Sequence, residues 1–328
     1  GGTADFSVHE VEEGGTLTEL YRASGGPYGG IYVDNEYLKM YETIFGAGSI
    51  DQLKTADMVE FLIMTREFEV RKRTVQECLS KNFISRISSV LNRKLTLNEK
   101  VEKVQSSYLK DQVSFINDKL KMSPNLIKSF FNNSIENIIS HIGNILKAIQ
   151  DVDMILLVGG YAESQLVQEK IKKKFENYSI IIPQDCNLVV MKGAVLFGHN
   201  PMSISARILR FTYGTSLHPM FDPKKHPQEN HYIDENGVER CRDFFDKLIC
   251  KNTKVPATGE IVTVDVVPLY ETQKLYLSRV YCTEKEDIIV VDESCELVGT
   301  LEVSVPSHVE GIWEAHEKYV FGMTEIEV

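Results

Sequence analysis

Residues 153–175 read DMILLVGGYAESQLVQEKIKKKF, a short apolar run followed by two glycines and an amphipathic segment. The run has no charged residue between 154 and 158, which predicts a strand buried on both faces. Apolar positions at helical spacing follow the glycines, which predicts a helix with Lys172–Lys174 on its solvated face. This order is typical of an α/β sheet covered by helices, and such sheets bind ligands at the carboxyl ends of their strands. We therefore expect an α/β fold with a candidate site at Gly159–Gly160.

Upstream of this stretch the sequence predicts one long amphipathic helix. Ser123 is a suitable N-cap and Pro124 suits the first turn. Apolar side chains then recur every three or four residues and predict a single buried stripe: Ile127, Phe131, Ile135, Ile138, Ile142, Ile145 and Ile149.

The N-terminal part alternates short strands and helices. Residues 6–13 and 15–24 predict a hairpin, since two alternating runs meet at Gly14 and Gly15. Two helices are expected next, one from an N-cap at Asp34 to a stop at Gly46 and one over 55–78. Residues 83–90 and 112–118 have the pattern of strands.

Beyond about residue 210 the helical periodicity gives way to alternating segments separated by proline, glycine and asparagine. The expected strand segments are 259–270, 273–281, 286–292, 298–305 and 318–328. The chain of 328 residues is also longer than most single domains. We predict two domains, 1–201 and 202–328, the second rich in β-strands.

Composition excludes several classes of function. The net charge of −11, from 36 basic and 47 acidic residues, argues against a nucleic-acid partner. No apolar run is long enough for a membrane span. The six cysteines form no CxxC pair, and the spacing of His218, His226 and His231 matches no common zinc pattern. Reduced thiols in a cytoplasmic protein are the plain expectation.

The chain begins with GGTAD, residues 1–5, which raises a specific chemical possibility. Adjacent glycines let a backbone turn come close to a ligand, while Thr3 and Asp5 supply a hydroxyl and a carboxylate. This combination suits phosphate and metal, although an ordinary glycine turn between two strands has the same letters. Gly29–Gly30 and Gly159–Gly160 are two further glycine turns.

Three segments in order carry a family resemblance: GGTADFSVHEV at 1–11, LLVGGYAES at 156–164 and DCNLVVMKGAVLFGHNP at 185–201. They resemble the second phosphate loop, the adenosine loop and the closing helix of the 70-kilodalton heat-shock protein family, more narrowly its divergent heat shock 70 kDa protein 12 branch. The resemblance implies lobe II of an actin-like (ribonuclease H-like) ATPase domain over 1–201, followed by a smaller β-sandwich-like domain. It also implies that the chain is a C-terminal fragment that begins at the second phosphate loop.

The resemblance implies a site for ATP or ADP with Mg²⁺. The backbone amides of Gly1, Gly2 and Thr3 would hold the β- and γ-phosphates, and Asp5 would hold Mg²⁺ through water. Gly29 and Gly30 would let a second turn approach the nucleotide.

The adenosine end of the implied site comes from two segments. Glu69 and Lys72, one helical turn apart, would reach the ribose hydroxyls, and Arg73 would lie against adenine. Gly159, Gly160 and Tyr161 would form the opposite wall of the base pocket.

The chain departs from the family pattern at four positions. Ile31 and Tyr32 replace acidic residues, Glu163 replaces an arginine of the adenosine loop, and Asn187 replaces an aspartate. Family members hydrolyse ATP between two lobes, so this chain alone is expected to have negligible ATPase activity.

The resemblance also implies partners. The β-rich domain of the family grips extended peptides under a helical lid, so unfolded clients and co-chaperones are expected partners of an ATP-binding, chaperone-like protein. Two alternatives remain open: a non-chaperone nucleotide-dependent switch or interaction protein on the same actin-like fold, and a small-molecule kinase, against which the β-rich tail speaks.

Overall fold

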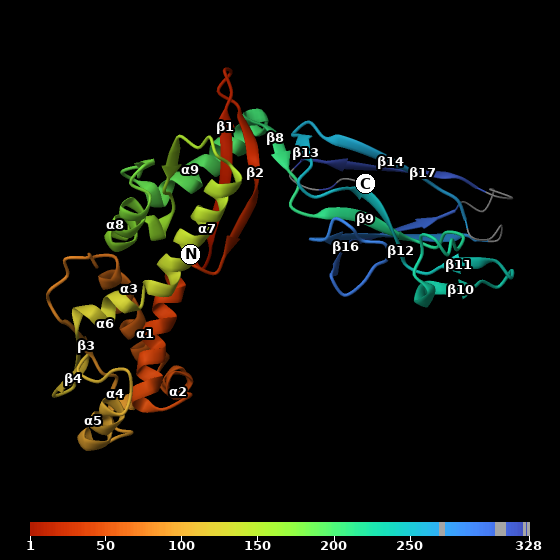
Figure 1. Ribbon diagram of the computed structural model, residues 1–328. Coiled ribbons are helices and arrows are strands. Elements are labelled where there is room, and N and C mark those ends of the chain that lie inside the picture. The colour runs from red at the N-terminus through yellow and green to blue at the C-terminus, as the bar shows by residue number, and fades with distance from the viewer. Residues whose placement is uncertain (269–272, 306–312, 324–325, 327–328) are drawn as a thin grey trace. The chain divides into compact units, whose positions relative to one another are not determined.

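The computed structural model describes residues 1–328 except 269–272, 306–312, 324–325 and 327–328 (Figure 1). The fold is mixed α/β with several sheets, as the sequence predicts, and is consistent with an actin-like ATPase lobe. Unit 1 comprises Gly1–Phe6 and Ser24–His199, and unit 2 comprises Ser7–Ala23 and Asn200–Val328. The division at 201/202 and the sandwich architecture stay predictions.

Unit 1 holds most of the helices. In chain order they are α1 (Gly30–Phe45), α2 (Ser49–Ala56), α3 (Met58–Lys72), α4 (Ser89–Asn92), α5 (Leu97–Gln105), α6 (Pro124–Ser129), α7 (Asn132–Ala148), α8 (Gln165–Lys174) and α9 (Cys186–His199), with the short 3-10 turn η1 (Gly160–Glu163) before α8. Its strands are β3 (Phe83–Arg86), β4 (Val113–Ile116), β5 (Lys119–Met122), β6 (Met154–Leu156) and β7 (Ser179–Ile181). The first three form an antiparallel sheet in the order β3-β5-β4, and β6 pairs in parallel with β7.

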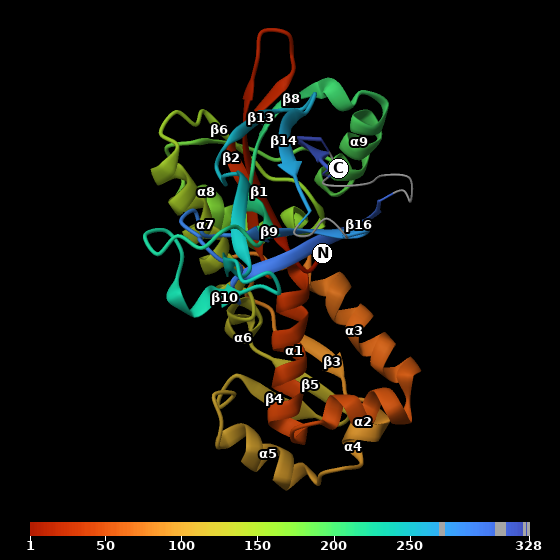
Figure 2. The same ribbon diagram turned by 90° about the vertical axis from the view of Figure 1, so that its right-hand side faces the viewer.

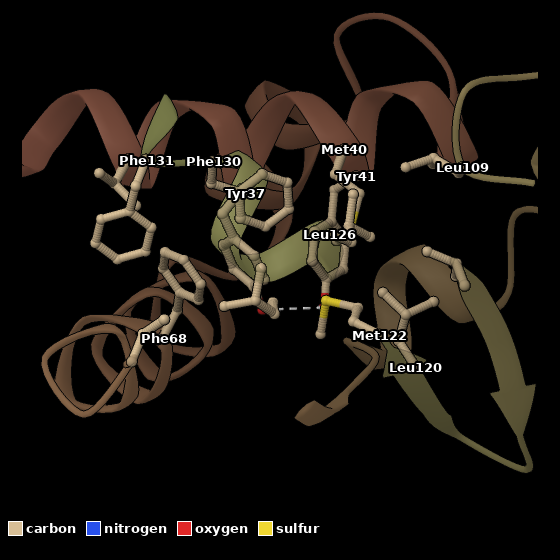
Figure 3. Packing of buried hydrophobic residues seen from close by; sticks show 14 of the residues in the cluster. Tyr37, Met40, Tyr41, Phe68, Leu109, Leu120, Met122, Leu126, Phe130 and Phe131 are labelled. Carbon is tan, nitrogen blue, oxygen red and sulfur yellow. Dashed lines mark hydrogen bonds between the residues drawn. The ribbon is translucent and has the colours of Figure 1, made fainter. Parts of the chain in front are cut away.

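The core of unit 1 is built around α1, which contacts α2, α3 and α5 (Figure 2). The rings of Tyr37 on α1 and Phe68 on α3 stack with centroids 3.9 Å apart, and Phe130 meets both rings edge-on (Figure 3). These side chains are almost wholly buried. Aromatic stacking adds to the burial of apolar area, so α1 and α3 are held in a defined relation. That relation positions the start of α1 and the end of α3, where the candidate site lies.

The predicted isoleucine stripe is confirmed as core from Ile127 to Ile145. The single helix predicted there is wrong, however, because α6 ends at Ser129 and α7 begins at Asn132. The start is as expected: Ser123 accepts a hydrogen bond from the backbone N–H of Leu126 at 3.1 Å.

Two helix boundaries also differ from the prediction. Helix α1 begins at Gly30, four residues before the predicted cap at Asp34, and Gly29 is its N-cap. The segment expected as one helix over 55–78 is divided, because Asp57 caps a new helix by accepting from the backbone N–H of Glu60 at 2.9 Å. The predicted stop at Gly46 is confirmed, with φ at 97°.

The prediction that the strand after 153 is buried on both faces is wrong. Strand β6 has three residues, and Met154 and Leu156 are each 53% exposed. Ile155 and Leu157 pack against the core of unit 1 from the other face. Among the described residues, therefore, only the side of this strand that carries Ile155 packs against the core of unit 1.

A capping box begins α5 and gives a test of local stability. Thr96 accepts from the backbone N–H of Glu99 at 3.4 Å, and the Glu99 carboxylate accepts from the backbone N–H of Thr96 at 2.7 Å. Thr96→Ala removes the cap and is expected to lower the free energy of unfolding by about 1 kcal/mol in urea titrations. Thr55→Ala is the matched control, because the Thr55 hydroxyl donates only to a carbonyl within α2. Equal stability of the two variants would contradict the assignment.

The hairpin β1 (Ala4–Val11) and β2 (Leu17–Gly26) is confirmed. Its strand β2 pairs in parallel with β8 through Leu17 and Thr18, in a sheet ordered β1-β2-β8-β13. The Thr18 hydroxyl lies 2.6 Å from that of Ser205. Residues 7–23 therefore pack with unit 2 rather than with the rest of the N-terminal segment.

Unit 2 is rich in strands, as predicted (Figure 1). Its further strands are β8 (Ile204–Ile208), β9 (Thr212–Leu217), β10 (His231–Ile233), β11 (Glu239–Cys241), β12 (Phe244–Ile249), β13 (Lys254–Pro256), β14 (Glu260–Val266), β15 (Leu275–Thr283), β16 (Cys295–Ser304) and β17 (Ala315–Phe321), with 3-10 turns η2 (Pro201–Ser203) and η3 (Gln228–Asn230). One sheet has the order β12-β9-β15-β16, and β14 pairs with β17.

Some predicted strands of unit 2 differ in extent. The segment 286–292 forms an isolated bridge between Val290 and Phe244 instead of a strand. Parts of the segments 259–270 and 318–328 lie outside the described residues.

Three expectations about composition can be compared with the structure. The described residues contain no group of three or more side chains able to hold a metal ion, and His226 accepts from the backbone N–H of Asp222 at 2.9 Å. All six cysteines are free thiols. Across the described residues, no helix has both the length and the apolar character needed to cross a membrane.

Candidate functional site

The first and second glycine turns are in backbone contact. The N–H of Gly29 donates to the carbonyl oxygen of Gly2 at 3.2 Å. A Cβ added to Gly29 would lie 2.4 Å from the carbonyl oxygen of Gly1 and 2.9 Å from the amide nitrogen of Thr3. Real Cβ atoms do not come so close to backbone atoms, so only glycine permits this approach. The chain thereby brings residues 1–3 next to the start of α1.

The second glycine turn also reaches the third. Gly30 is buried, and a Cβ there would lie 3.3 Å from the ring of Tyr161 and 3.5 Å from Nζ of Lys72. Gly159, at the third turn, has φ of 89°, a conformation that favours glycine. Its N–H donates to the carbonyl oxygen of Cys186 at 2.6 Å. The three turns and the end of α3 thus converge in one region of unit 1.

Lys72 is buried and already occupied. Its Nζ donates to Oδ2 of Asp34 at 2.6 Å and to the carbonyl oxygen of Gly30 at 2.9 Å. The side chains of Lys72 and Asp34 are 11% and 28% exposed. Asp34 lies inside α1, whose N-cap is Gly29, and its carboxylate points to α3. Oδ1 of Asp34 is buried without a hydrogen-bond partner among the described residues. Burial raises the pKa of the Asp34 carboxyl, and the Lys72 ammonium opposes that shift.

Arg73 stands at the exposed end of α3 between two carboxylates. Its Nη2 lies 3.1 Å from Oε1 of Glu69, and its Nη1 lies 3.6 Å from Oε2 of Glu163 on η1. Glu69 and Lys72 lie one turn apart but do not pair with each other, because Lys72 turns inward and Glu69 pairs with Arg73. Glu69 and Arg73 remain half exposed and accessible to a ligand.

Tyr161 faces inward. Its hydroxyl accepts from the Ser134 hydroxyl at 3.0 Å, and burial raises the pKa of Tyr161 to about 12. The Tyr161 ring lies against Gly30 and so packs against the second glycine turn. The exposed part of this wall is Gly160.

Asp5 and Thr3 lie at the open side of the first turn. Both are exposed, and the Thr3 hydroxyl donates to Oδ2 of Asp5 at 2.9 Å. An exposed carboxylate close to the two glycines of the first turn fits a hydrated Mg²⁺ with a phosphate. The exposed guanidinium of Arg73 suits the planar base at the other end. The residues present therefore fit a magnesium nucleotide, with Lys72 in a supporting place rather than in direct contact.

Sequence reasoning missed Asp34 and Ser134 as parts of this region. Asp34 follows Gly30 by one helical turn, and that spacing is the signal that would have placed it beside the glycine. Ser134 lies more than a hundred residues from Gly30, and nothing local marks it.

The sequence of the chain is similar to those of known heat-shock proteins. No family model matches it. It is 33% identical to Heat shock 70 kDa protein 12A of Homo sapiens over 316 residues and 30% identical to Heat shock 70 kDa protein 12B of Homo sapiens over 322 residues. The chain is a divergent relative of the 70-kilodalton heat-shock family. The resemblance predicted from residues 1–11, 156–164 and 185–201 is thus confirmed.

The alignments cover most of this chain but less than half of each relative. Each alignment covers 93% of this chain and 46% of the relative, in the relative's C-terminal part. The chain therefore spans about half the length of the heat-shock proteins it matches. The mouse Heat shock 70 kDa protein 12A gives the same 33% identity.

Proposed function

We propose that this chain provides one side of an ATP- or ADP-binding site that works with Mg²⁺ in a chaperone-like protein of the divergent heat-shock branch. The observation that carries the proposal is the convergence of residues 1–3, Gly29–Gly30, the end of α3 and η1 in unit 1. Segments so distant in sequence meet there through glycine backbone, and such backbone allows the close approach that phosphates require. The similarity to heat-shock proteins supports the same reading.

The proposed arrangement gives each residue a task. The amides of Gly1, Gly2 and Thr3 hold the phosphates, and Asp5 holds the hydrated Mg²⁺, which neutralises phosphate charge when bound. Glu69 accepts from the ribose hydroxyls. Arg73 lies on the base, and Gly159, Gly160 and Tyr161 form the far wall. Lys72 holds Asp34 and the carbonyl of Gly30 in place and so sets the shape of the second turn.

Unit 2 is the proposed place for client peptides. Its two sheets, β12-β9-β15-β16 and β14-β17, are the components from which a β-sandwich is built. Under this proposal, unfolded segments bind there and nucleotide in unit 1 controls the binding. A switch without client folding is the second candidate, favoured by Glu163 and by Ile31, which depart from the pattern of the family.

Titration of the chain with MgATP tests the nucleotide proposal. We expect saturable amide shift changes in the NMR spectrum in the millimolar range or below, at residues of the three turns. Asp5→Asn is expected to weaken MgATP binding about tenfold while it changes metal-free ATP little, because the carboxylate acts through the metal. Glu10→Gln, which alters another exposed carboxylate of β1, is the charge-matched control. No shift at the three turns at any concentration would refute the proposal.

An aggregation assay separates the chaperone from the switch. A chaperone suppresses aggregation of a denatured client and responds to ATP. A switch binds ATP and leaves the aggregation unchanged.

A further inference from the structure

Arg73 and Glu163 join two segments that the nucleotide proposal places on opposite sides of the base. Nη1 of Arg73, the C-cap residue of α3, lies 3.6 Å from Oε2 of Glu163, on η1. The other ion pair of Arg73, with Glu69, runs along its own helix and bridges nothing. The pair with Glu163 therefore spans the space between the two walls.

The main chain that follows Arg73 is hydrogen-bonded to the main chain that follows Glu163. The N–H of Leu166, at the start of α8, donates to the carbonyl oxygen of Val75 at 3.2 Å, just beyond the end of α3. The Gln76 and Gln165 side chains are also hydrogen-bonded to each other. The distance between the two walls is thus set by the main chain, while the Arg73 and Glu163 side chains, 54% and 29% exposed, can rotate.

Stacking on a purine and pairing with the Glu163 carboxylate both engage the same guanidinium, that of Arg73. Stacking on a purine requires the flat face of the guanidinium to turn to the base, whereas the Glu163 carboxylate holds the guanidinium by an N–H edge and so directs its plane toward η1. An exposed ion pair of this kind is weak and is screened by salt. The ion pair can therefore occupy the base end of the site and still be displaced by a ligand.

We propose that the Arg73–Glu163 ion pair is a latch across the base end of the site, which a purine nucleoside must displace in order to bind. The inference rests on the proposed nucleotide site and adds a control to it: Glu163 sets the affinity for the base through Arg73. Affinity is then lower than the site would otherwise give, and it rises when the latch is weakened.

Adenosine is the sharpest probe, because it carries no charge and salt cannot act on it through phosphates. Glu163→Gln is expected to bind adenosine two- to fivefold more tightly than the wild type in NMR titrations, which is the range that an exposed ion pair supplies. Raising the salt concentration is expected to strengthen adenosine binding to the wild type and to leave Glu163→Gln unchanged, because only the wild type has a latch to screen.

Glu67→Gln is the matched control. Glu67 pairs with Arg71 at 2.7 Å one turn earlier on α3, so this variant loses the same charge without touching the latch. We expect wild-type affinity for adenosine. Equal affinity of Glu163→Gln and wild type, or an equal gain in Glu67→Gln, would overturn the latch while MgATP binding to the wild type still upheld the nucleotide site. Absence of both MgATP and adenosine binding in every variant would overturn the site and the latch together.

Discussion

Gly29→Ala is expected to lower the free energy of unfolding of unit 1 by about 2 kcal/mol and to weaken MgATP binding at least tenfold. The new Cβ would lie 2.4 Å from the carbonyl oxygen of Gly1, 2.7 Å from the carbonyl carbon of Gly2 and 2.9 Å from the amide of Thr3. Backbone atoms cannot turn away as a long side chain can, so the two turns must separate, and overpacking of this kind costs about 1–3 kcal/mol. Once separated, they no longer present their amides to one phosphate group.

Gly143→Ala gives the matched control for the same chemical change. Gly143 lies within α7, and a Cβ there meets no atom within 4 Å. Alanine favours helix more than glycine, so this variant is expected to gain about 0.5–1 kcal/mol. Urea unfolding followed by far-ultraviolet circular dichroism reports on both variants, because the helices α1 to α9 lie in unit 1. A Gly29→Ala protein as stable as the wild type would show that the first two turns do not touch.

Local sequence signals predicted much of this fold for clear physical reasons. The hairpin, the cap at Ser123 and the buried isoleucines up to Ile145 depend on turn residues, capping and periodicity within a few residues. The break between α6 and α7 had no such signal, since Phe130 and Phe131 suit a continuing helix and both are buried in the core. There, tertiary packing overrides local propensity.

The site divides in the same way. Its glycines could be found from the sequence, because only glycine allows close backbone approach, and Gly29 and Gly30 are indeed buried at a contact. The partner of Lys72 could not be found, since Asp34 is 38 residues away and its pattern suggested a helix cap. The partner of a buried charged side chain is set by residues that the fold places beside it, which can be distant in sequence. The direction in which Lys72 points is therefore a tertiary property.

Lys72→Met is expected to lower the free energy of unfolding by about 3 kcal/mol at neutral pH. The change leaves the Asp34 carboxylate, 28% exposed, without the ammonium that lies 2.6 Å away, and breaking a mostly buried ion pair from one side costs several kcal/mol. Asp34→Asn in the same chain removes the stranded charge, so the double variant is expected to recover most of the loss. Lys39→Met, which removes an exposed partner of Glu36, is expected to change stability little.

The pH dependence of Lys72→Met provides the decisive measurement. Burial already raises the pKa of Asp34, and without the ammonium the opposing influence is gone, so the pKa rises further. A carboxyl whose folded pKa lies above its unfolded value takes up a proton on folding. It therefore adds stability below the unfolded pKa, and that stability is lost as pH rises through the folded pKa. The deficit of Lys72→Met against the wild type should thus shrink as pH falls from neutral, whereas the double variant should show no such trend. A deficit that stays constant with pH would mean that lost packing of the lysine stem, and not the stranded carboxylate, causes the instability.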